Sequence, residues 1–455
     1  MAAGIPRAPA FLAPPTSRPY HVCPSSAAEA FEPPREPSRG PPLRPRAGPA
    51  RCPELDSTAQ TTPVVIDALR TPIGKFLGGL SALSAADLGT QVVEALLART
   101  GVEGAAVQQL IFGNGRQAGG GPNPARQIAV RAGLGQDCTA WTVNMACASG
   151  LKSLTLAADE IRLGRAQAIV AGGTESMSRL PFFLPEMRRG YRLGHAPLVD
   201  GMYQDGFHCP LADMLMGATA EGLAKELGIP REAQDEFALA SQHKSQAARE
   251  AGRFADELAP VEAPAKRGAT VRIEADEHPR DNAKLESLAK LPPVFDSESG
   301  SVSAGNSSGI TDGAAALLLT SAGFAEQHGL TPLAYVGDSA EAGVDPARMG
   351  IGPVPACRAL EERNGIAPDQ YDLVELNEAF AAQVLACDRD LHLPADRLNV
   401  NGGAISLGHP IGATGARIVV TLLHELRRRG GENGLATLCV SGGMGIATHF
   451  HRRGL

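Results

Sequence analysis

Apolar residues recur along most of the chain at spacings that predict strands and helices in turn. A short apolar run at 64–66 indicates a first strand, and a helix is expected at 84–100 because five apolar side chains fall on one of its faces: Leu88, Val92, Val93, Leu96 and Leu97. Further strands are expected at 109–112, 140–144 and 166–171, and further helices at 125–132 and 151–163. Regular alternation of this kind predicts a layered α/β core.

The order of these elements occurs twice. In the first unit a strand ends at Val143-Asn144, a turn and a helix follow, and the next strand runs to Gly172-Gly173. The second unit has a strand ending at Val400-Asn401, a turn that contains His409, a helix at 412–428 and a strand at 435–440 before Gly442-Gly443. Upstream of each unit a strand leads into an asparagine, Asn114 or Asn377. The repetition predicts a duplicated fold.

The predicted organisation has four parts. Residues 1–61 form an extension, 62–180 with 310–331 form the first half, 181–309 are an inserted region, and 332–455 form the second half. The first 60 residues hold 14 of the 35 prolines and seven arginines but no lysine, and they lack apolar periodicity. Such a segment buries too little surface to offset its ordering entropy, so disorder is expected.

Composition and charge exclude several classes of function. The formal charge of −7, from 42 basic and 49 acidic residues, argues against a nucleic-acid partner. Apolar runs such as 314–319 are too short to span a membrane. The eight cysteines include no Cys-x-x-Cys pair, which favours a reducing compartment. We expect a cytoplasmic protein; organellar targeting by the extension and a misassigned translation start stay open.

Three residues are candidates for chemistry. Cys147 lies between a strand and a helix start, where unpaired N–H groups and a partial positive charge favour the thiolate. His409 lies in a loop with five glycines in fifteen residues (401–415), which suits a general base or an oxyanion donor. Cys439 ends a strand and leads into the glycine-rich run 441–445. For each the alternative is structural, either a buried cysteine or a turn histidine.

A twofold relation between the halves would bring Cys147, His409 and Cys439 together where the halves meet. The stretches around them are Asn144-Met-Ala-Cys-Ala-Ser-Gly-Leu151, Asn377-Glu-Ala-Phe-Ala381, Gly402–Gly415 with its His-Pro pair, and Cys439-Val-Ser-Gly-Gly-Met-Gly445. In order and spacing, these motifs resemble the signatures of the thiolase family over residues 62–455. The resemblance implies two similar mixed-sheet α/β halves in a layered αβαβα arrangement, with 181–309 as a loop domain that binds CoA.

The resemblance also implies an activity and a role for each matching residue. The activity is the reversible thiolysis of 3-ketoacyl-CoA, or condensation of acyl-CoA with acetyl-CoA, through an acyl-cysteine. Cys147 matches the nucleophile, His409 its activating base, and Cys439 the acid/base for the α-carbon. Asn377 matches the residue that holds a water in one oxyanion hole, and the N–H groups of Cys147 and Ser441 would form a second. Three positions match CoA contacts: Ser308 at the pantetheine, and Arg280 and Ser287 at the nucleotide end.

Two departures from the family pattern concern the pocket. Ser441 stands where many members have glycine, which is tolerable if its φ is negative. Leu215 stands where acetoacetyl-CoA thiolases usually have histidine, so a longer or broader range of 3-ketoacyl-CoA substrates is expected. Met216 and Met349 are candidates for the pocket lining, with core packing as the alternative.

No cofactor is expected, because CoA and acyl-CoA are substrates and two thiols with one imidazole supply the chemistry. His424-Glu425 begins like a zinc-protease motif, but Arg428 occupies the place of its second histidine. Two rival functions stay open. A decarboxylating ketosynthase would be expected to have a histidine in place of Cys439, and a non-catalytic acyl-CoA-binding relative would lack part of the constellation. The family resemblance implies a homodimer or homotetramer.

Overall fold

The computed structural model describes residues 60–454, so the predicted disordered extension falls outside the described residues except for its last two positions. The first half of the chain forms five strands in the spatial order β4 (Thr139–Val143), β3 (Gln109–Gly113), β5 (Ala168–Ser176), β12 (Thr311–Ser321) and β1 (Pro63–Arg70). β3 pairs parallel with β4 and β5, whereas β12 pairs antiparallel with β5 and β1.

The second half repeats this order with β14 (Leu373–Leu376), β15 (Asn433–Val440), β16 (Met444–His451) and β13 (Ala334–Gly343). β14 pairs parallel with β15, and β16 pairs antiparallel with β15 and β13. β1 and β13 join the two halves through two residue pairs, Val64 with Tyr335 and Val65 with Ala334. The duplication seen in the sequence is therefore present in the strand order.

One predicted strand is wrong. The segment expected to end as a strand at Val400-Asn401 keeps a single parallel bridge, from Leu398 to Val374. Asn399 has a φ of 45°, which turns the chain out of the extended conformation. Its side-chain amide bonds both backbone groups of Leu376, accepting from the N–H and donating to the C=O at 2.9 Å each. The side chain thus replaces the ladder that a fifth strand would have made.

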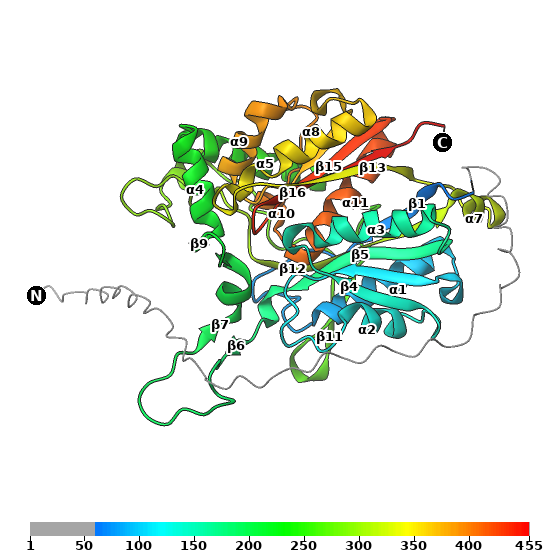
Figure 1. Ribbon diagram of the computed structural model, residues 1–455, viewed down its shortest axis with the longest axis horizontal. Helices are drawn as coiled ribbons and strands as arrows, with labels where there is room; N and C mark the ends of the chain where they lie inside the picture. The colour runs from blue at the N-terminus through cyan, green and yellow to red at the C-terminus, as the bar shows by residue number, and fades with distance from the viewer. Residues whose placement is uncertain (1–59, 455) are drawn as a thin grey trace, which may run out of the picture. The chain divides into compact units, whose positions relative to one another are not determined.

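Helices cover both faces of each half. α3 (Ser149–Arg162) and α11 (Ile411–Arg429) lie between the two groups of strands, as Figure 1 shows. α1 (Ala85–Thr100) and α2 (Pro124–Arg131) cover the outer face of the first half, and α8 (Pro353–Asn364) and α9 (Ala381–Leu391) that of the second. The layers therefore alternate helix, strand, helix, strand, helix, and the expected fold class is confirmed.

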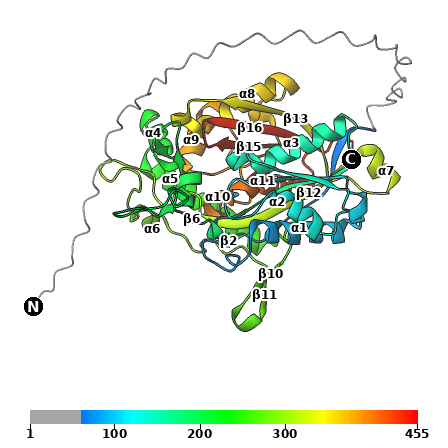
Figure 2. The same ribbon diagram turned by 60° about the horizontal axis from the view of Figure 1, so that its bottom comes forward.

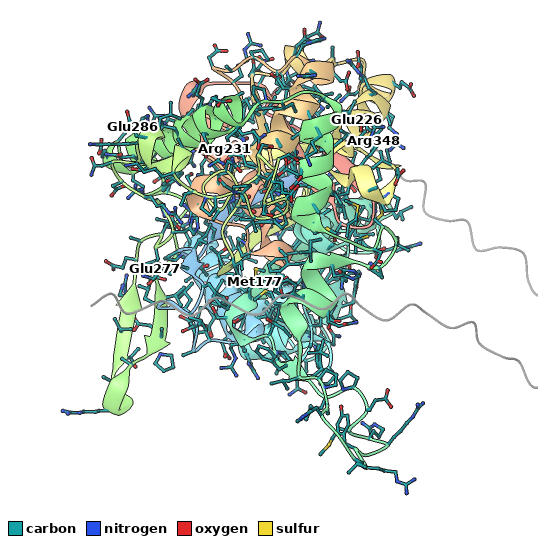
Figure 3. The ribbon with its side chains drawn as sticks, turned by 90° about the vertical axis from the view of Figure 1, so that its left-hand side faces the viewer. Met177, Glu226, Arg231, Glu277, Glu286 and Arg348 are labelled. Atoms are coloured by element: carbon teal, nitrogen blue, oxygen red, sulfur yellow. The ribbon has the colours of Figure 1, made fainter. Side chains whose placement is uncertain are left out.

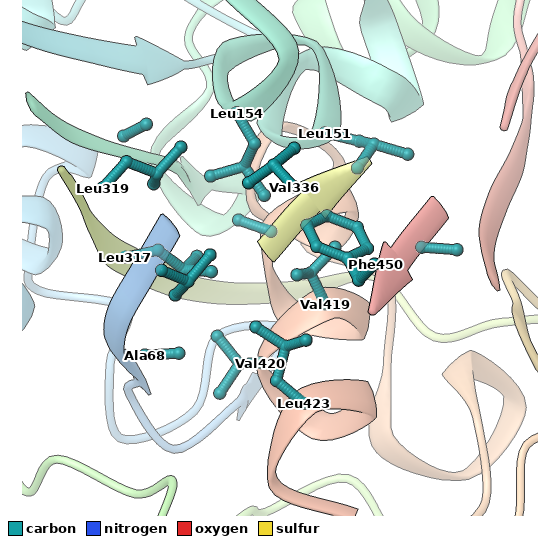
Figure 4. Close-up of a cluster of buried hydrophobic side chains, with 14 of the residues drawn as sticks. Ala68, Leu151, Leu154, Leu317, Leu319, Val336, Val419, Val420, Leu423 and Phe450 are labelled. Carbon is teal, nitrogen blue, oxygen red and sulfur yellow. The ribbon is translucent and has the colours of Figure 1, made fainter. Parts of the chain in front are cut away.

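The central pair of helices packs at backbone distance. A Cβ on Gly150 would lie 2.7 Å from the Ala416 nitrogen, and one on Gly415 would lie 2.3 Å from the Leu151 nitrogen. Only glycine fits at these two positions. Around the contact, aliphatic side chains from α3, α11 and both halves form one buried cluster, which Figure 4 shows with Leu151, Leu154, Val419, Val420 and Phe450. This packing fixes the start of each central helix relative to the other.

The inserted region contributes the remaining large elements, α4 (Met216–Glu226), α5 (Arg231–Glu250) and α6 (Leu285–Ala289). β10 (Val261–Pro264) and β11 (Thr270–Ile273) form a hairpin that projects from the domain in Figure 2. The shorter elements are β2 (Gly74–Lys75), β6 (Phe182–Phe183), β7 (Val199–Asp200), β8 (His208–Cys209), β9 (Met214–Leu215), α7 (Ala322–Gln327) and α10 (Ala404–Leu407). Over residues 60–454, no helix is both long and apolar enough to traverse a lipid bilayer.

Candidate active site

A cavity of about 250 Å³ lies where the two halves and the inserted region meet. It is lined by the three candidate catalytic residues Cys147, His409 and Cys439, and also by Ser308, Ser441, Met216 and Met349. Cys147 and Cys439, which are 292 positions apart in the sequence, therefore share one site.

Cys147 lies in a tight helical turn, Ala146–Ala148, that leads directly into α3. Ala146 has a φ of 45°, a left-handed conformation that is costly for a residue with a Cβ. The Asn144 side chain holds this turn by accepting the Ala146 N–H at 3.0 Å, and the Ser149 hydroxyl bonds the Met145 N–H and the Ala146 C=O. The strained turn is thus fixed from both sides, and it presents the thiol to the cavity.

Apolar packing supports the same residue from behind. Cys147 packs against a buried cluster that includes Met177, Met202 and Ile411, and Figure 3 labels Met177. Burial raises the pKa of the Cys147 thiol above its ordinary value, while the charge of Arg116 and the backbone N–H groups of Ser441 and Cys147 act in the opposite direction. The resting residue is therefore a thiol that needs a base.

His409 is held as a base by its hydrogen bonds. Its Nδ1 lies 2.6 Å from the Thr414 hydroxyl oxygen, and that hydroxyl donates its one proton to the Pro410 C=O at 3.0 Å. With the hydroxyl proton on this carbonyl, Thr414 accepts from His409, and we therefore assign the ring proton to Nδ1. Nε2 is then unprotonated, buried and without a hydrogen-bond partner in the described protein. Burial and the nearby charges of Arg417 and Arg116 lower the pKa of His409 to about 3, so the ring is neutral.

Cys439 is fully buried near the end of β15. It belongs to a small apolar cluster with Met349 and Ala379, against which Met216 packs. Burial raises the pKa of Cys439 well above its ordinary value, and the sulfur of Cys147 adds to the shift. Cys439 is therefore a protonated thiol at neutral pH, and it lines the same cavity as Cys147.

Two groups of donors are candidates for the oxyanion holes, and the second, Asn377, is buried but absent from the residues that line the cavity. The N–H groups of Ser441 and Cys147 both act on the Cys147 sulfur. Ser441 avoids the left-handed region, and the turn is made instead by Gly442 and Gly443, with φ of 92° and 85°. The condition set for Ser441 from the sequence is therefore met. The buried Asn377 side chain has no hydrogen-bond partner on either its oxygen or its nitrogen among residues 60–454, so it is free to hold a small polar molecule.

Two buried carboxylates lock the loops around the cavity. Glu175 accepts from the Asn114 amide and from the N–H groups of Gly115, Arg116 and Gly412 at 2.6–3.2 Å, which ties β3 and β5 to the start of α11. Burial raises the pKa of Glu175 to about 7.

Glu378, the second buried carboxylate, ties the inserted region to the loop before His409. It accepts from Ser241, Asn399 and the Ile405 N–H at 2.7–3.1 Å, and so fixes the segment before His409. Both clamps join parts of the chain that the sequence pattern left unconnected.

The residues expected to bind CoA fall into two groups. Ser308, Met216 and Met349 line the cavity. Arg280 and Ser287 are exposed and lie outside the cavity lining. Glu286, the neighbour of Ser287 in α6, lies at the edge of the molecule in Figure 3. The assignment of Arg280 and Ser287 to the nucleotide end of CoA stays a prediction.

Sequence reasoning missed several residues of the site. Arg116, Tyr203, Phe207, Ile310 and Phe380 also line the cavity. Arg116 could have been found, because it follows the strand that leads into Asn114, at the same end of the first half as Cys147. Tyr203 and Phe207 lie in a π-helical turn of the inserted region, where no periodic pattern marks their position.

Comparisons with known proteins agree with this geometry. The family model "Thiolase, N-terminal domain" matches residues 63–323, and "Thiolase, C-terminal domain" matches 330–452. An "Acetyl-CoA acetyltransferase" of Pseudomonas aeruginosa is 51% identical over 389 residues, which cover 86% of this chain and 99% of that protein. One from Cupriavidus necator is 49% identical over 393 residues, covering 86% of this chain and 100% of its own length.

Solved structures show the same similarity. An acetyl-CoA acetyltransferase of Bacillus anthracis superposes with a TM-score of 0.84 at 42% identity, over 87% of this chain and all of the other. The human mitochondrial 3-ketoacyl-CoA thiolase in complex with CoA gives a TM-score of 0.82 at 40% identity, over 86% of this chain and 98% of that one.

Proposed function

Because the chain belongs to the thiolase family and is a CoA-dependent acyltransferase, we propose that Cys147, His409 and Cys439 divide the steps of 3-ketoacyl-CoA thiolysis among them. The observation that carries this proposal is that both sulfurs and the imidazole line one cavity. The neutral Nε2 of His409 takes the proton of Cys147 as its sulfur attacks the C3 carbonyl. The oxyanion that forms there is stabilised by preorganised donors.

Bond cleavage follows from this adduct. The C2–C3 bond breaks and its electron pair goes to C2, which gives the enolate of acetyl-CoA. This enolate takes a proton at C2 from Cys439, acetyl-CoA leaves, and the Cys439 thiolate later takes the proton of the incoming CoA thiol. The raised pKa of Cys439 supports this role, because the thiol still carries its proton at neutral pH. The acyl group stays on Cys147 until the thiol of CoA attacks the thioester. Condensation is the same sequence in reverse.

The two sets of donors supply the electrostatic part of the mechanism. We assign the N–H groups of Cys147 and Ser441 to one oxyanion, and His409 with a water on Asn377 to the other. Removing a single donor of this kind costs roughly 3 kcal/mol of transition-state stabilisation. In this scheme CoA and acyl-CoA are substrates, and no cofactor takes part.

We extend the proposal to acyl groups longer than that of the four-carbon substrate. Leu215, Phe207, Phe295 and Ile310 give it apolar walls. We propose that the enzyme accepts a longer or broader range of 3-ketoacyl-CoA substrates. We further propose that it works in the cytoplasm as a homodimer or homotetramer. Neither rival function is supported, since the relatives are named acetyltransferases and Cys147, Asn377, His409 and Cys439 are all present.

Thiolysis rates with 3-ketoacyl-CoA esters of increasing length test the proposal. We expect cleavage of the C4 ester and equal or higher kcat/KM for C6 and C8. A sharp preference for C4 would contradict the proposed chain length, and no cleavage of any ester would contradict the mechanism. Cys147→Ser should abolish the reaction, and Cys357→Ser, at a buried cysteine outside the cavity lining, is the matched control.

A further inference from the structure

The lining of the cavity contains one charged side chain whose charge the proposed mechanism does not use. Arg116 is 9% exposed and lines the cavity together with Cys147 and His409. Apart from Arg116 and the neutral His409, no lining residue carries an ionisable nitrogen or a carboxylate, and most of the walls are aliphatic or aromatic. A guanidinium in such surroundings loses much of its hydration, which is costly unless an anion compensates for it.

The hydrogen bonds of Arg116 hold the guanidinium without neutralising it. One terminal nitrogen donates to the Gly115 C=O at 3.3 Å and the other to the Gly206 C=O at 3.1 Å. Nε has no partner in the part of the chain that the structure describes. Both partners are uncharged, so the two loops orient the guanidinium without neutralising its charge. Some of its N–H groups are still available to a ligand.

No carboxylate of residues 60–454 forms an ion pair with Arg116. Burial raises the pKa of Glu175, and the charge of Arg116 acts in the opposite direction. The oxygens of Glu175, however, accept hydrogen bonds from the Asn114 amide and from the N–H groups of Gly115, Arg116 and Gly412. The pantetheine arm and the thioester carbonyl are neutral, and the phosphates of CoA lie at its opposite end. The thiolate, oxyanion and enolate of the mechanism are transient. A lasting anion that meets Arg116 inside the cavity must therefore be carried by the acyl group.

Building on the proposed function, we infer that Arg116 is a specificity-determining residue for 3-ketoacyl-CoA substrates whose acyl chain ends in a carboxylate. A guanidinium binds a carboxylate through short, charge-assisted hydrogen bonds. With a six-carbon substrate, attack by Cys147 on C3 and cleavage of C2–C3 release acetyl-CoA. A four-carbon acyl group with its terminal carboxylate stays on the sulfur and then passes to CoA. No oxidant or further reactant is needed.

The loop that holds Arg116 also encloses this end of the cavity. Gly206 lies in the π-helical turn Tyr203–Phe207, and the two aromatic rings of that turn stack edge to face with centroids 5.7 Å apart. A Cβ on Gly206 would lie 2.8 Å from Nε of Arg116, so the turn packs directly on the guanidinium. One short segment thus supplies both apolar wall and the orientation of the charge.

The test compares substrates that differ only in the terminal group. Thiolysis is measured with six-, seven- and eight-carbon 3-ketodicarboxylyl-CoA esters and with their isosteres that end in methyl. We expect at least one acid to exceed its isostere roughly 10- to 100-fold in kcat/KM, the value of a charge-assisted hydrogen bond. Arg116→Leu should bring the ratio of acid to isostere, measured on the same variant, down to about one, whatever its effect on the rate that both substrates share. Arg116→Lys should retain part of the preference, and Arg165→Leu, at an exposed arginine outside the cavity lining, should change nothing.

Each other result overturns the inference and is distinguishable from failure of the proposed function. If the wild-type enzyme cleaves methyl-ended esters and prefers none of the acids, the inference is wrong and the thiolase assignment stands. If Arg116→Leu slows acids and isosteres equally and shifts the pH profile, the charge serves Cys147 rather than the substrate. If no ester of either kind is cleaved, the proposed function itself is contradicted. The wild-type comparison decides the matter even if a variant fails to fold.

Discussion

The hydrogen bond between His409 and Thr414 offers a sharp test of how the base is prepared. Replacing Thr414 by valine keeps the shape of the side chain but removes the oxygen that accepts the Nδ1 proton at 2.6 Å. Thr414 is fully buried, and His409 is 7% exposed, so water does not readily replace the lost acceptor. The ring must then either leave Nδ1–H unpaired or move its proton to Nε2, the atom that we propose takes the proton of Cys147.

Both routes have a calculable cost. An unpaired buried donor costs about 1–3 kcal/mol. Because 1.4 kcal/mol corresponds to a factor of ten, a tautomer equilibrium shifted by this 1–3 kcal/mol leaves far less of the ring with an unprotonated Nε2. We therefore expect kcat to fall about 10- to 100-fold. We expect KM to change much less, since Thr414 is absent from the cavity lining. Thr414→Ser keeps the hydroxyl and should recover most of the rate.

The assay is thiolysis of acetoacetyl-CoA together with thermal unfolding of each variant. Nitrogen-15 NMR of the His409 ring reports the tautomer directly: protonated Nδ1 in the wild type and a larger share of protonated Nε2 in Thr414→Val. If Thr414→Val lowers the melting temperature but leaves kcat and the tautomer unchanged, the hydrogen bond only supports the fold and the reasoning is refuted.

Four further predictions follow from the site and its supports. Because burial raises the pKa of Cys147 and lowers that of His409 to about 3, the resting pair is a thiol and a neutral imidazole. The rate of alkylation of Cys147 by iodoacetamide should therefore keep rising with pH up to at least pH 9. A rate that is already constant from about pH 5 would indicate a thiolate–imidazolium pair. Cys439→Ser should still form the acyl-enzyme but lose condensation by a factor of at least about 100, and unchanged condensation would remove Cys439 from proton transfer. Gly113→Ala should destabilise the fold by about 1–3 kcal/mol in denaturant unfolding, because its Cβ would lie 2.4 Å from the Ser149 carbonyl carbon at the start of α3; equal stability would contradict the close contact. The matched control is Gly222→Ala, because Gly222 lies in α4 with open space around it. This substitution should raise the free energy of unfolding by about 0.5–1 kcal/mol, and a lower stability would count against the packing described.

Much of the fold was predictable because its elements are long and strongly periodic. The helix expected at 84–100 is α1, where the Ser84 hydroxyl accepts the Asp87 N–H and Gly101 ends the helix with a φ of 68°. The internal repeat was visible because each half uses the same strand order. The strand expected before Asn401 failed because one side chain, that of Asn399, took over the hydrogen bonds of a strand.

The site was predictable only in part. The junction of a strand and a helix marked Cys147, and glycine-rich loops marked His409 and Cys439, since local sequence sets those turns. The roles of Glu175, Glu378 and Arg116 depend on contacts between distant segments, such as Glu175 with Gly412 or Arg116 with Gly206. Periodicity carries no information about such pairings, and the tautomer of His409 depends on a hydroxyl five residues away whose own proton is committed elsewhere.

The central claim is that Cys147 carries the acyl group during turnover. Two reactions test it most directly: the wild-type protein is mixed with a 3-ketoacyl-CoA ester in the absence of CoA, and Cys439→Ser is mixed with acetyl-CoA, whose acyl transfer needs no proton at the α-carbon. The trapped adduct is then mapped by peptide mass spectrometry. We predict a thioester on the peptide that contains Cys147 in both proteins and none in Cys147→Ser. An adduct on another residue, or acetyl-CoA release with Cys147 unmodified throughout, would contradict the account.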